Sequence, residues 1–242
     1  MIMIQVRSWI YLVAFLAWTV IVGVGLSPSL VKASWAMVTI RLWIGGIMVL
    51  AKYIVGITCR VKGHEHLPVD ADGKVGACIV AAQHQSSFET YRLFLDLPHP
   101  IFILKRELIW IPLVGWYMQR AGFISIDRGA GAAAMRKMLR AAQAALANGQ
   151  QVIVFPEGTR VQPGQDRTYR PGIVALYNTC RVPVVPMALN SGRLWGKTRV
   201  LKLPGEIVFQ FLPALPTGLD KDGVLTELRT RLEAAEVLLP NS

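Results

Sequence analysis

A histidine and a glutamate five residues apart follow an apolar run near residue 80. His84 and Glu89 begin and end the segment His84-Gln85-Ser86-Ser87-Phe88-Glu89, and the run at 75–82 before it predicts a buried strand. A carboxylate that holds one imidazole nitrogen leaves the other free to act as a general base. Strand ends are where α/β proteins usually place their chemistry. His84 and Glu89 are therefore candidate catalytic residues.

The spacing of this pair imposes a geometric condition. Residues five apart diverge by about 140° around a regular helix, so His84 can reach Glu89 only if it lies before the helix that contains Glu89. A purely structural role competes with catalysis, because Ser86 as N-cap and Glu89 three positions later form a capping box. The pair alone leaves both roles open.

A second polar cluster, Phe155-Pro156-Glu157-Gly158-Thr159-Arg160, follows another predicted strand. Gly158 allows a tight backbone turn. Arg160 offers a planar fork that suits phosphate or carboxylate, and Glu157 would hold that guanidinium or accept a substrate hydroxyl. A surface turn with a solvated ion pair is the simpler alternative.

More cations are predicted at the ends of other strands. Lys105 and Arg106 follow one strand, Arg128 follows another, and Arg170 opens a later helix. Each alone would be an ordinary surface charge. Several along one edge of a sheet favour an anionic ligand, since helix N-termini also attract anions.

Strand and helix patterns alternate through the rest of the chain. This alternation predicts an α/β fold with a mostly parallel central sheet flanked by helices. Strands are predicted at 59–63, 76–82, 101–104, 123–126, 152–155, 182–189 and 201–211, and helices at 88–97, 112–119, 130–148, 173–179 and 223–238.

The first 57 residues are apolar and break at Ser27-Pro28-Ser29. Residues 9–26 carry no charge and would make about 27 Å of helix, close to the thickness of a bilayer core. Residues 30–57 contain Lys32, Arg41 and Lys52, and three cations are costly at a bilayer centre. We therefore predict a membrane-anchoring helical hairpin at 1–57 that dips into one leaflet, followed by an α/β domain at 58–242.

A cleaved signal peptide and a single membrane span are the alternatives to a hairpin at this N-terminus. A signal peptide would have a shorter apolar region and a better cleavage site than 31–33. A single span would be followed by a soluble helix. Four tryptophans are expected to sit at the membrane interface, namely Trp9, Trp18, Trp35 and Trp43.

Composition favours a protein that associates with a membrane surface. The net charge is +11 and the mean hydropathy is +0.41, and a basic protein with an apolar end fits an anionic membrane surface. Nucleic-acid binding is disfavoured because the chain has no zinc-finger spacing or basic zipper. The three cysteines form no Cys-x-x-Cys pair, and His64-x-His66 lies in a predicted loop with no acidic cluster, so no metal site is expected.

Four ordered blocks resemble the glycerolipid acyltransferase family, specifically its bacterial 1-acyl-sn-glycerol-3-phosphate acyltransferases. The resemblance covers roughly residues 57–215. The first block is 84–89, which is similar to the family's His-x4-Asp, and the third is 155–160. The second is 105–128, with Lys105-Arg106-Glu107-Leu108, Gly115-Trp116 and Ile126-Asp127-Arg128. The fourth is 182–188, which begins Val182-Pro183-Val184-Val185-Pro186. The apolar hairpin also resembles the two-helix anchor of bacterial members.

The resemblance implies transfer of a fatty acyl group from a thioester to the sn-2 hydroxyl of lysophosphatidic acid, which gives phosphatidic acid. His84 would be the general base, oriented by Glu89, which stands where the family usually has Asp. No cofactor is implied, because acyl-CoA or acyl-carrier protein is a co-substrate. The residues implied to hold the phosphorylated acceptor are Lys105, Arg128, Glu157, Gly158, Thr159 and Arg160, and those implied to line the acyl or acceptor cleft are Val184, Val185 and Pro186.

Several functions stay open from the sequence alone. The acceptor is alternatively glycerol-3-phosphate, lyso-ornithine lipid or another lysolipid. From different functional classes, a non-catalytic lipid-binding protein and a serine lipase remain, although no Gly-x-Ser-x-Gly turn surrounds Ser86 or Ser87. The expected location is the cytoplasmic side of a bacterial inner membrane, because Arg7 precedes the first apolar run.

Overall fold

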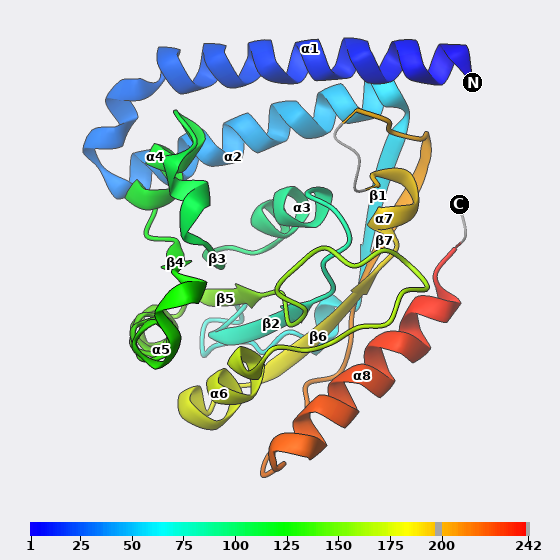
Figure 1. The fold of residues 1–242 in the computed structure, drawn as a ribbon. Coiled ribbons are helices and arrows are strands. Elements are labelled where there is room, and N and C mark those ends of the chain that lie inside the picture. Colours follow the sequence, from blue (N-terminus) through cyan, green and yellow to red (C-terminus); the bar gives the residue numbers. More distant parts are fainter. Residues whose placement is uncertain (197–199, 241–242) are drawn as a thin grey trace.

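A mostly parallel sheet forms the centre of the molecule (Figure 1). The computed structural model describes residues 1–196 and 200–240. Within these residues the sheet has seven strands in the order β1-β7-β6-β2-β5-β3-β4, and only β6 and β7 pair antiparallel. The strands are β1 Ile57–Lys62, β2 Cys78–Ala82, β3 Pro100–Lys105, β4 Ile124–Ile126, β5 Gln151–Val154, β6 Val184–Leu189 and β7 Gly205–Phe211.

Helices cover both faces of this sheet, so its central strands are buried on both sides. Successive residues of a strand point to opposite faces, and accordingly Val80 and Val185 pack in one core while Ile79 and Val184 pack in the other. The first core includes α2 Ala33–Leu50, α3 Phe88–Asp96 and α4 Val114–Arg120; the second includes α5 Gly131–Ala147, α6 Pro171–Cys180 and α8 Lys221–Leu238.

The parallel arrangement brings the polar clusters to one edge. Strands β2, β5, β3 and β4 all run the same way, so the segments that follow them emerge at the same edge of the sheet. The predicted α/β class and its mostly parallel sheet are confirmed. The short helix α7 Ser191–Leu194 was not predicted, because four residues are too few to show a helical period.

The N-terminal residues form two apolar helices that lie outside the sheet (Figure 1). Helix α1 Ile2–Gly25 is joined by a 3-10 turn, Ser27–Val31, to α2, which a π-helical turn extends to Val55. The two helices pack closely where the Trp18 ring lies against Gly46, since a Cβ at Gly46 would come within 2.2 Å of the indole. Strand β1 begins at Ile57, one residue before the predicted boundary.

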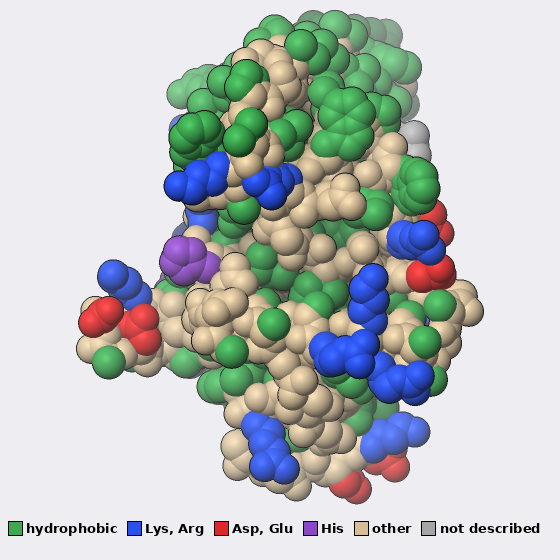
Figure 2. Space-filling view, turned by 90° about the vertical axis from the view of Figure 1, so that its left-hand side faces the viewer, with side chains coloured by type: hydrophobic (Ala, Val, Ile, Leu, Met, Phe, Trp, Pro, Cys, Tyr) green, Lys and Arg blue, Asp and Glu red, His purple; other side chains and the backbone are tan. Residues whose placement is uncertain are grey.

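Both helices are long and apolar enough to cross a membrane by length and composition. Most residues of both helices are exposed or partly exposed, and hydrophobic side chains cover the upper part of the molecule in Figure 2. Exposed Trp110 and Trp116, beside and within α4, add to this apolar surface although they lie far along the chain. Helix α4 is held there by the Tyr117 hydroxyl, which donates to the Gly23 carbonyl at 3.3 Å.

The structure changes the expected role of the cation inside α2. Arg41 does not extend into a membrane interface; its guanidinium donates to carbonyls at the end of α3, including Phe94 O at 3.0 Å and Leu97 O at 2.8 Å. A cation near a helix C-terminus satisfies free carbonyls and complements the helix dipole. Of the other two cations, Lys32 precedes α2 and Lys52 lies in its final π turn.

Two of the four tryptophans predicted at a membrane interface face the protein instead. Trp18 donates to the Trp43 carbonyl at 2.9 Å, and Trp43 donates to the Thr19 hydroxyl at 3.0 Å. Both therefore connect α1 to α2. Trp9 and Trp35 are more than half exposed, as an interfacial position requires.

Candidate active site

His84 and Glu89 meet as the spacing argument required. His84 lies in the loop between β2 and α3, and Glu89 lies in the first turn of α3. The His84 Nδ1 atom is 2.9 Å from Glu89 Oε1, so Nε2 is left to face a substrate. The His84 ring stacks on Phe155 with centroids 4.0 Å apart, and its side chain is 17% exposed. A substrate hydroxyl can therefore reach the ring.

Glu89 is fully buried and also organises the loop around it. Its Oε1 accepts the backbone N–H groups of Gln85 and Ser86, and its Oε2 accepts the hydroxyls of Ser86 and Ser191. Burial by itself would raise the pKa of Glu89, but the hydrogen bonds from His84 and Ser86 and the His84 charge outweigh it and lower the pKa. Glu89 thus bonds both His84 and Ser86, although the N-cap of α3 is Ser87 and not the predicted Ser86.

The loop after β5 is bonded directly to the His84 loop. The Val161 amide donates to the His84 carbonyl at 2.8 Å, and the Gln162 side chain donates to the Gln85 carbonyl at 3.1 Å. Gly158 has φ 65°, a left-handed conformation that favours glycine at this turn. The two sequence clusters are therefore two halves of one site.

Glu157 points into the protein, where its neighbour is Arg167. Its carboxylate is 1% exposed, and its Oε1 lies 3.7 Å from Arg167 Nε. Burial raises the pKa of Glu157 to about 7, against the opposing effects of its own backbone amide, the Arg167 charge and the His84 backbone. Pairing of Glu157 with Arg160 was one expectation from sequence; the described contacts of Glu157 are instead with Arg167.

Arg160 is the cation of this loop that remains partly open to solvent. Among the described residues it forms no hydrogen bond or ion pair, and the neighbouring Thr159 is exposed. Lys202 lies near it: burial, helped by the Arg160 charge, lowers the pKa of Lys202 to about 8. The Lys202 ammonium sits 4.9 Å from the centre of the Trp195 ring, whose indole donates to Ser87 Oγ at 3.1 Å.

Lys105 and Arg128 lie farther out on the same edge. Lys105 ends β3, is half exposed, and pairs with Glu107 at 2.9 Å. The backbone of Arg128 begins a 3-10 turn just after β4, and its side chain lies outside what the structure describes. In the strand order, β5 separates β3 and β4 from the His84 loop.

Val184, Val185 and Pro186 lie within β6, and all three are buried. Val184 borders a pocket at the start of β6, at the opposite edge of the sheet from His84. Their role in a cleft stays a prediction that this placement does not support.

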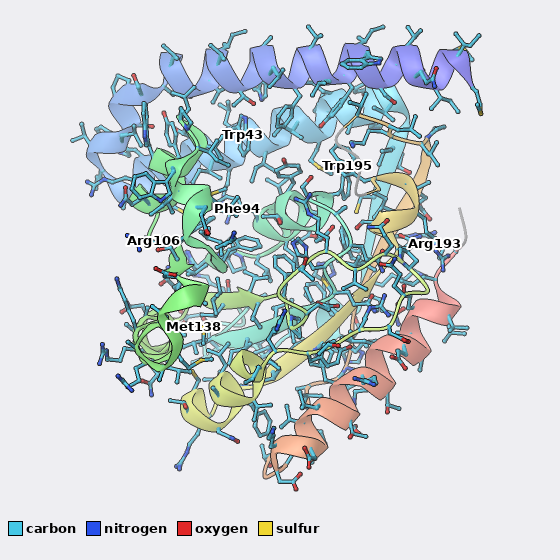
Figure 3. The ribbon with its side chains drawn as sticks, viewed as in Figure 1. Trp43, Phe94, Arg106, Met138, Arg193 and Trp195 are labelled. Atoms are coloured by element: carbon cyan, nitrogen blue, oxygen red, sulfur yellow. The ribbon has the colours of Figure 1, made fainter. Side chains whose placement is uncertain are left out.

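An apolar pocket lies instead between the N-terminal helices and α3 and α4. Trp43 of α2 and Phe94 of α3, both labelled in Figure 3, belong to its lining. It reaches Thr90 and Tyr91, which directly follow Glu89. Its other lining residues are Thr19, Val22, Gly23, Thr39, Ile40, Ile44, Leu113, Val114, Tyr117, Met118 and Phe123.

A buried polar network connects the site to α8, and the sequence predicted no role for the side chains that form it. These are Gln83, Gln85, Arg167 and Glu236. Glu236 of α8 accepts from the side chains of Gln83 at 2.9 Å and Gln85 at 3.0 Å, and lies 2.7 Å from Arg167 Nη2. Arg167 in turn faces Glu157. Both loops of the site are thereby connected to the C-terminal helix.

The described residues include no group of three or more His, Cys, Asp or Glu side chains that would hold a metal ion. The arrangement that they do provide is a base, a cation and an apolar pocket. It suits the removal of a proton from a hydroxyl beside an anionic group and a hydrocarbon chain.

Comparison with known proteins agrees with this chemistry. The chain is 32% identical over 185 residues to a 1-acyl-sn-glycerol-3-phosphate acyltransferase of Pseudomonas aeruginosa, covering 76% of this chain and 70% of the relative. It is 34% identical over 176 residues to the human alpha enzyme of the same name, covering 72% of this chain and 60% of that relative.

A solved structure shares the fold. The 1-acyl-sn-glycerophosphate acyltransferase PlsC of Thermotoga maritima superimposes with a TM-score of 0.74 at 22% identity, covering 97% of this chain and 98% of that one. The family model described as "Acyltransferase" matches residues 58–190, which include both loops of the site. With this match and the Pseudomonas relative, the chain belongs to the acyltransferase family.

Proposed function

We propose that this protein transfers a fatty acyl group from an acyl thioester to the sn-2 hydroxyl of lysophosphatidic acid, forming phosphatidic acid. One observation carries the proposal: the His84–Glu89 pair is bonded, through Val161 and Gln162, to the loop that presents Arg160. A base and a phosphate-binding cation thus belong to one rigid unit. The names of the relatives above support the same acceptor.

In this reaction His84 Nε2 takes the proton of the sn-2 hydroxyl as its oxygen attacks the thioester carbonyl. A new C–O bond forms, the C–S bond breaks, and the proton passes to the departing thiolate. Glu89 stabilises the imidazolium that forms, because its buried carboxylate stays ionised 2.9 Å from Nδ1. No covalent acyl-enzyme, metal or redox cofactor takes part in this sequence of steps.

Substrate binding is divided between charge and apolar surface. Arg160 is proposed to bind the phosphate, with Lys105 and Arg128 as outer cations and with Gly158 and Thr159 shaping the loop. The apolar pocket beside Tyr91 is proposed to receive an acyl chain. Glu157 is proposed to act by fixing the loop from inside, since its carboxylate is buried.

The exposed apolar surface of α1, α2 and α4 supports a location at a membrane. We propose that the hairpin dips into the cytoplasmic leaflet of a bacterial inner membrane, which would hold the site where lysolipid and thioester meet. The donor is proposed to be acyl-CoA or acyl-carrier protein. Glycerol-3-phosphate and lyso-ornithine lipid are the alternative acceptors.

The proposal is tested with purified protein in lipid nanodiscs, a radiolabelled acyl thioester and four acceptors: lysophosphatidic acid, lyso-ornithine lipid, glycerol-3-phosphate and a neutral lysolipid. We expect phosphatidic acid to be the main product. Faster acylation of another acceptor would reassign the substrate, and transfer to none of them would refute the proposed activity.

A further inference from the structure

The outer face of α5 is basic and has no described role in the site. Its sequence, Gly131–Ala147, contains no acidic residue. Arg136, Lys137 and Arg140 are all exposed, whereas Met138 is buried in the core on the side toward the sheet, where Figure 3 shows it. Arg136 and Arg140 are four residues apart and thus share one side of the helix.

The three cations of α5 are not paired with carboxylates in the part of the chain that the structure describes. Among the described residues none of the three side chains forms an ion pair or a hydrogen bond, while Arg92, Arg106 and Arg231 each pair with a carboxylate. Before and after the cations, α5 exposes mainly alanines, namely Ala132, Ala133, Ala144 and Ala147, which add little bulk around the charges. Unpaired like charges on one face repel each other and favour an anionic partner.

Helix α6 connects α5 to the loop that carries Arg160. Arg170, which is exposed, donates its backbone N–H to the Pro156 carbonyl at 2.8 Å, within the loop that carries Arg160. It opens α6, and Gly172 at the start of that helix lies against Met135 and Met138 of α5. We call the four residues Arg136, Lys137, Arg140 and Arg170 the α5 basic patch.

The position of the patch separates it from the apolar surface. Helices α5 and α6 cover the face of the sheet opposite to α2, α3 and α4 (Figure 1). Figure 2 shows Lys and Arg side chains gathered across the middle of the α5 side, well below the hydrophobic cap, by which we mean the exposed apolar surface of α1 and α2 with Trp110 and Trp116. If the cap lies in the membrane, the patch faces water, where it would meet a soluble partner and not lipid headgroups.

We propose that the α5 basic patch is the docking surface for an acidic acyl-carrier protein that delivers the thioester. This inference rests on the proposed acyl transfer and adds the route of the donor. A soluble acidic protein fits the charge and the aqueous position of the patch, and its tethered acyl group would enter at the neighbouring loop. Electrostatic steering of this kind acts mainly on encounter and weakens with salt.

The test compares two donors that carry the same acyl chain, acyl-carrier protein and acyl-CoA. The variant is the triple substitution Arg136→Glu/Lys137→Glu/Arg140→Glu in the full-length protein in nanodiscs. We expect its KM for the acyl-carrier protein to rise about tenfold or more, with kcat and the KM for acyl-CoA within about twofold of wild type. The salt dependence of the wild-type KM for the carrier protein should be lost.

The matched control reverses three exposed lysines elsewhere, Lys62→Glu/Lys74→Glu/Lys221→Glu, which changes the net charge equally. It should leave both KM values near wild type. Three results would overturn the docking surface. The control could show the same rise in KM for the carrier protein as the triple variant, or the triple variant could show the same rise in KM for both donors. The third is a wild-type enzyme that uses acyl-CoA but not the carrier protein. Release of the triple variant from vesicles would also overturn it and would assign the patch to lipid. A wild-type enzyme that uses neither donor would refute the proposed function itself.

Discussion

At the scale of single residues, the candidate site combines a buried carboxylate, Glu89, that is bonded to His84 with a partly exposed cation, Arg160. Glu89 is fully buried and accepts four hydrogen bonds in addition to its contact with His84, whereas Arg160 has no hydrogen bond or ion pair among the described residues. The first arrangement fixes geometry before the substrate arrives. The second leaves Arg160 available to bind an anionic group when the substrate arrives.

Replacing Arg160 should therefore affect one class of acceptor. Arg160→Ala is expected to raise the KM for lysophosphatidic acid about 10- to 100-fold, since a hydrogen bond to a charged group contributes about 1.5–3 kcal/mol. The KM for a neutral lysolipid should change little. Arg160→Lys, which keeps the charge, should lie between wild type and alanine. Equal effects on both acceptors would remove the phosphate role of Arg160.

Glu157 makes the stability of the protein depend on pH. Because its pKa is raised from 4.5 to about 7 in the folded state, the folded protein holds a proton that the unfolded chain has lost. The stabilisation that Glu157 protonation adds to the free energy of unfolding is therefore complete below pH 4.5. It is lost as the pH rises through 7, and the total loss is on the order of a few kcal/mol. Glu157→Gln should remove it.

The measurement is the melting temperature of wild type and Glu157→Gln between pH 5 and pH 8. The melting temperature of Glu157→Gln minus that of wild type should increase as the pH rises. Parallel curves over this range would show that Glu157 is already ionised at pH 5.

At the scale of elements, α8 reaches the catalytic loop from the far end of the sequence. Glu236 binds Gln83 and Gln85, which flank His84, and it pairs with Arg167, which faces Glu157. A buried carboxylate with three such partners fixes both loops relative to each other. Gln85 also accepts the Gly192 amide at 2.9 Å, which joins α7 to the same network.

Glu236→Gln should lower kcat about tenfold with both KM values nearly unchanged, because the base is displaced while the binding groups remain. Its melting temperature should also fall, since breaking a buried pair leaves Arg167 uncompensated. Glu233→Gln on the exposed side of the same helix is the matched control and should behave as wild type. A Glu236→Gln protein that melts lower but keeps its kcat would deny α8 any part in positioning.

The sequence allowed the α/β elements and the two loops to be predicted because both signals are local. The apolar runs mark strands, and the spacing of His84 and Glu89 implies the turn between them. The Arg167–Glu236 pair could not be predicted in this way, because its two residues are 69 positions apart and nothing in either segment identifies the partner. Arg41 is similar: its charge was visible, but the α3 carbonyls that it caps were not.

At the scale of the whole molecule, three surfaces point in different directions: an apolar cap, the edge that carries the site, and the α5 basic patch. The cap is built from the N-terminal helices together with Trp110 and Trp116, so it is a property of the fold and not of the hairpin alone. With the cap in a membrane, as we propose, the site would lie beside the bilayer and stay open to water.

The cap predicts tight membrane association. The intact protein should remain in the membrane pellet after washing with alkaline carbonate, which removes proteins held by charge alone. The fraction released is measured by immunoblotting, with a soluble enzyme as the control. Complete release of intact protein would contradict a hairpin embedded in the leaflet.

Turnover of His84→Ala with lysophosphatidic acid and an acyl thioester tests most directly whether His84 is the base of a direct acyl transfer. We expect kcat to fall about 10²- to 10⁴-fold or more, with a melting temperature near wild type. Glu89→Gln should slow transfer by orders of magnitude, and His99→Ala, which removes an exposed histidine, should not. Near-normal turnover by a folded His84→Ala protein would show that His84 is not the base of the transfer.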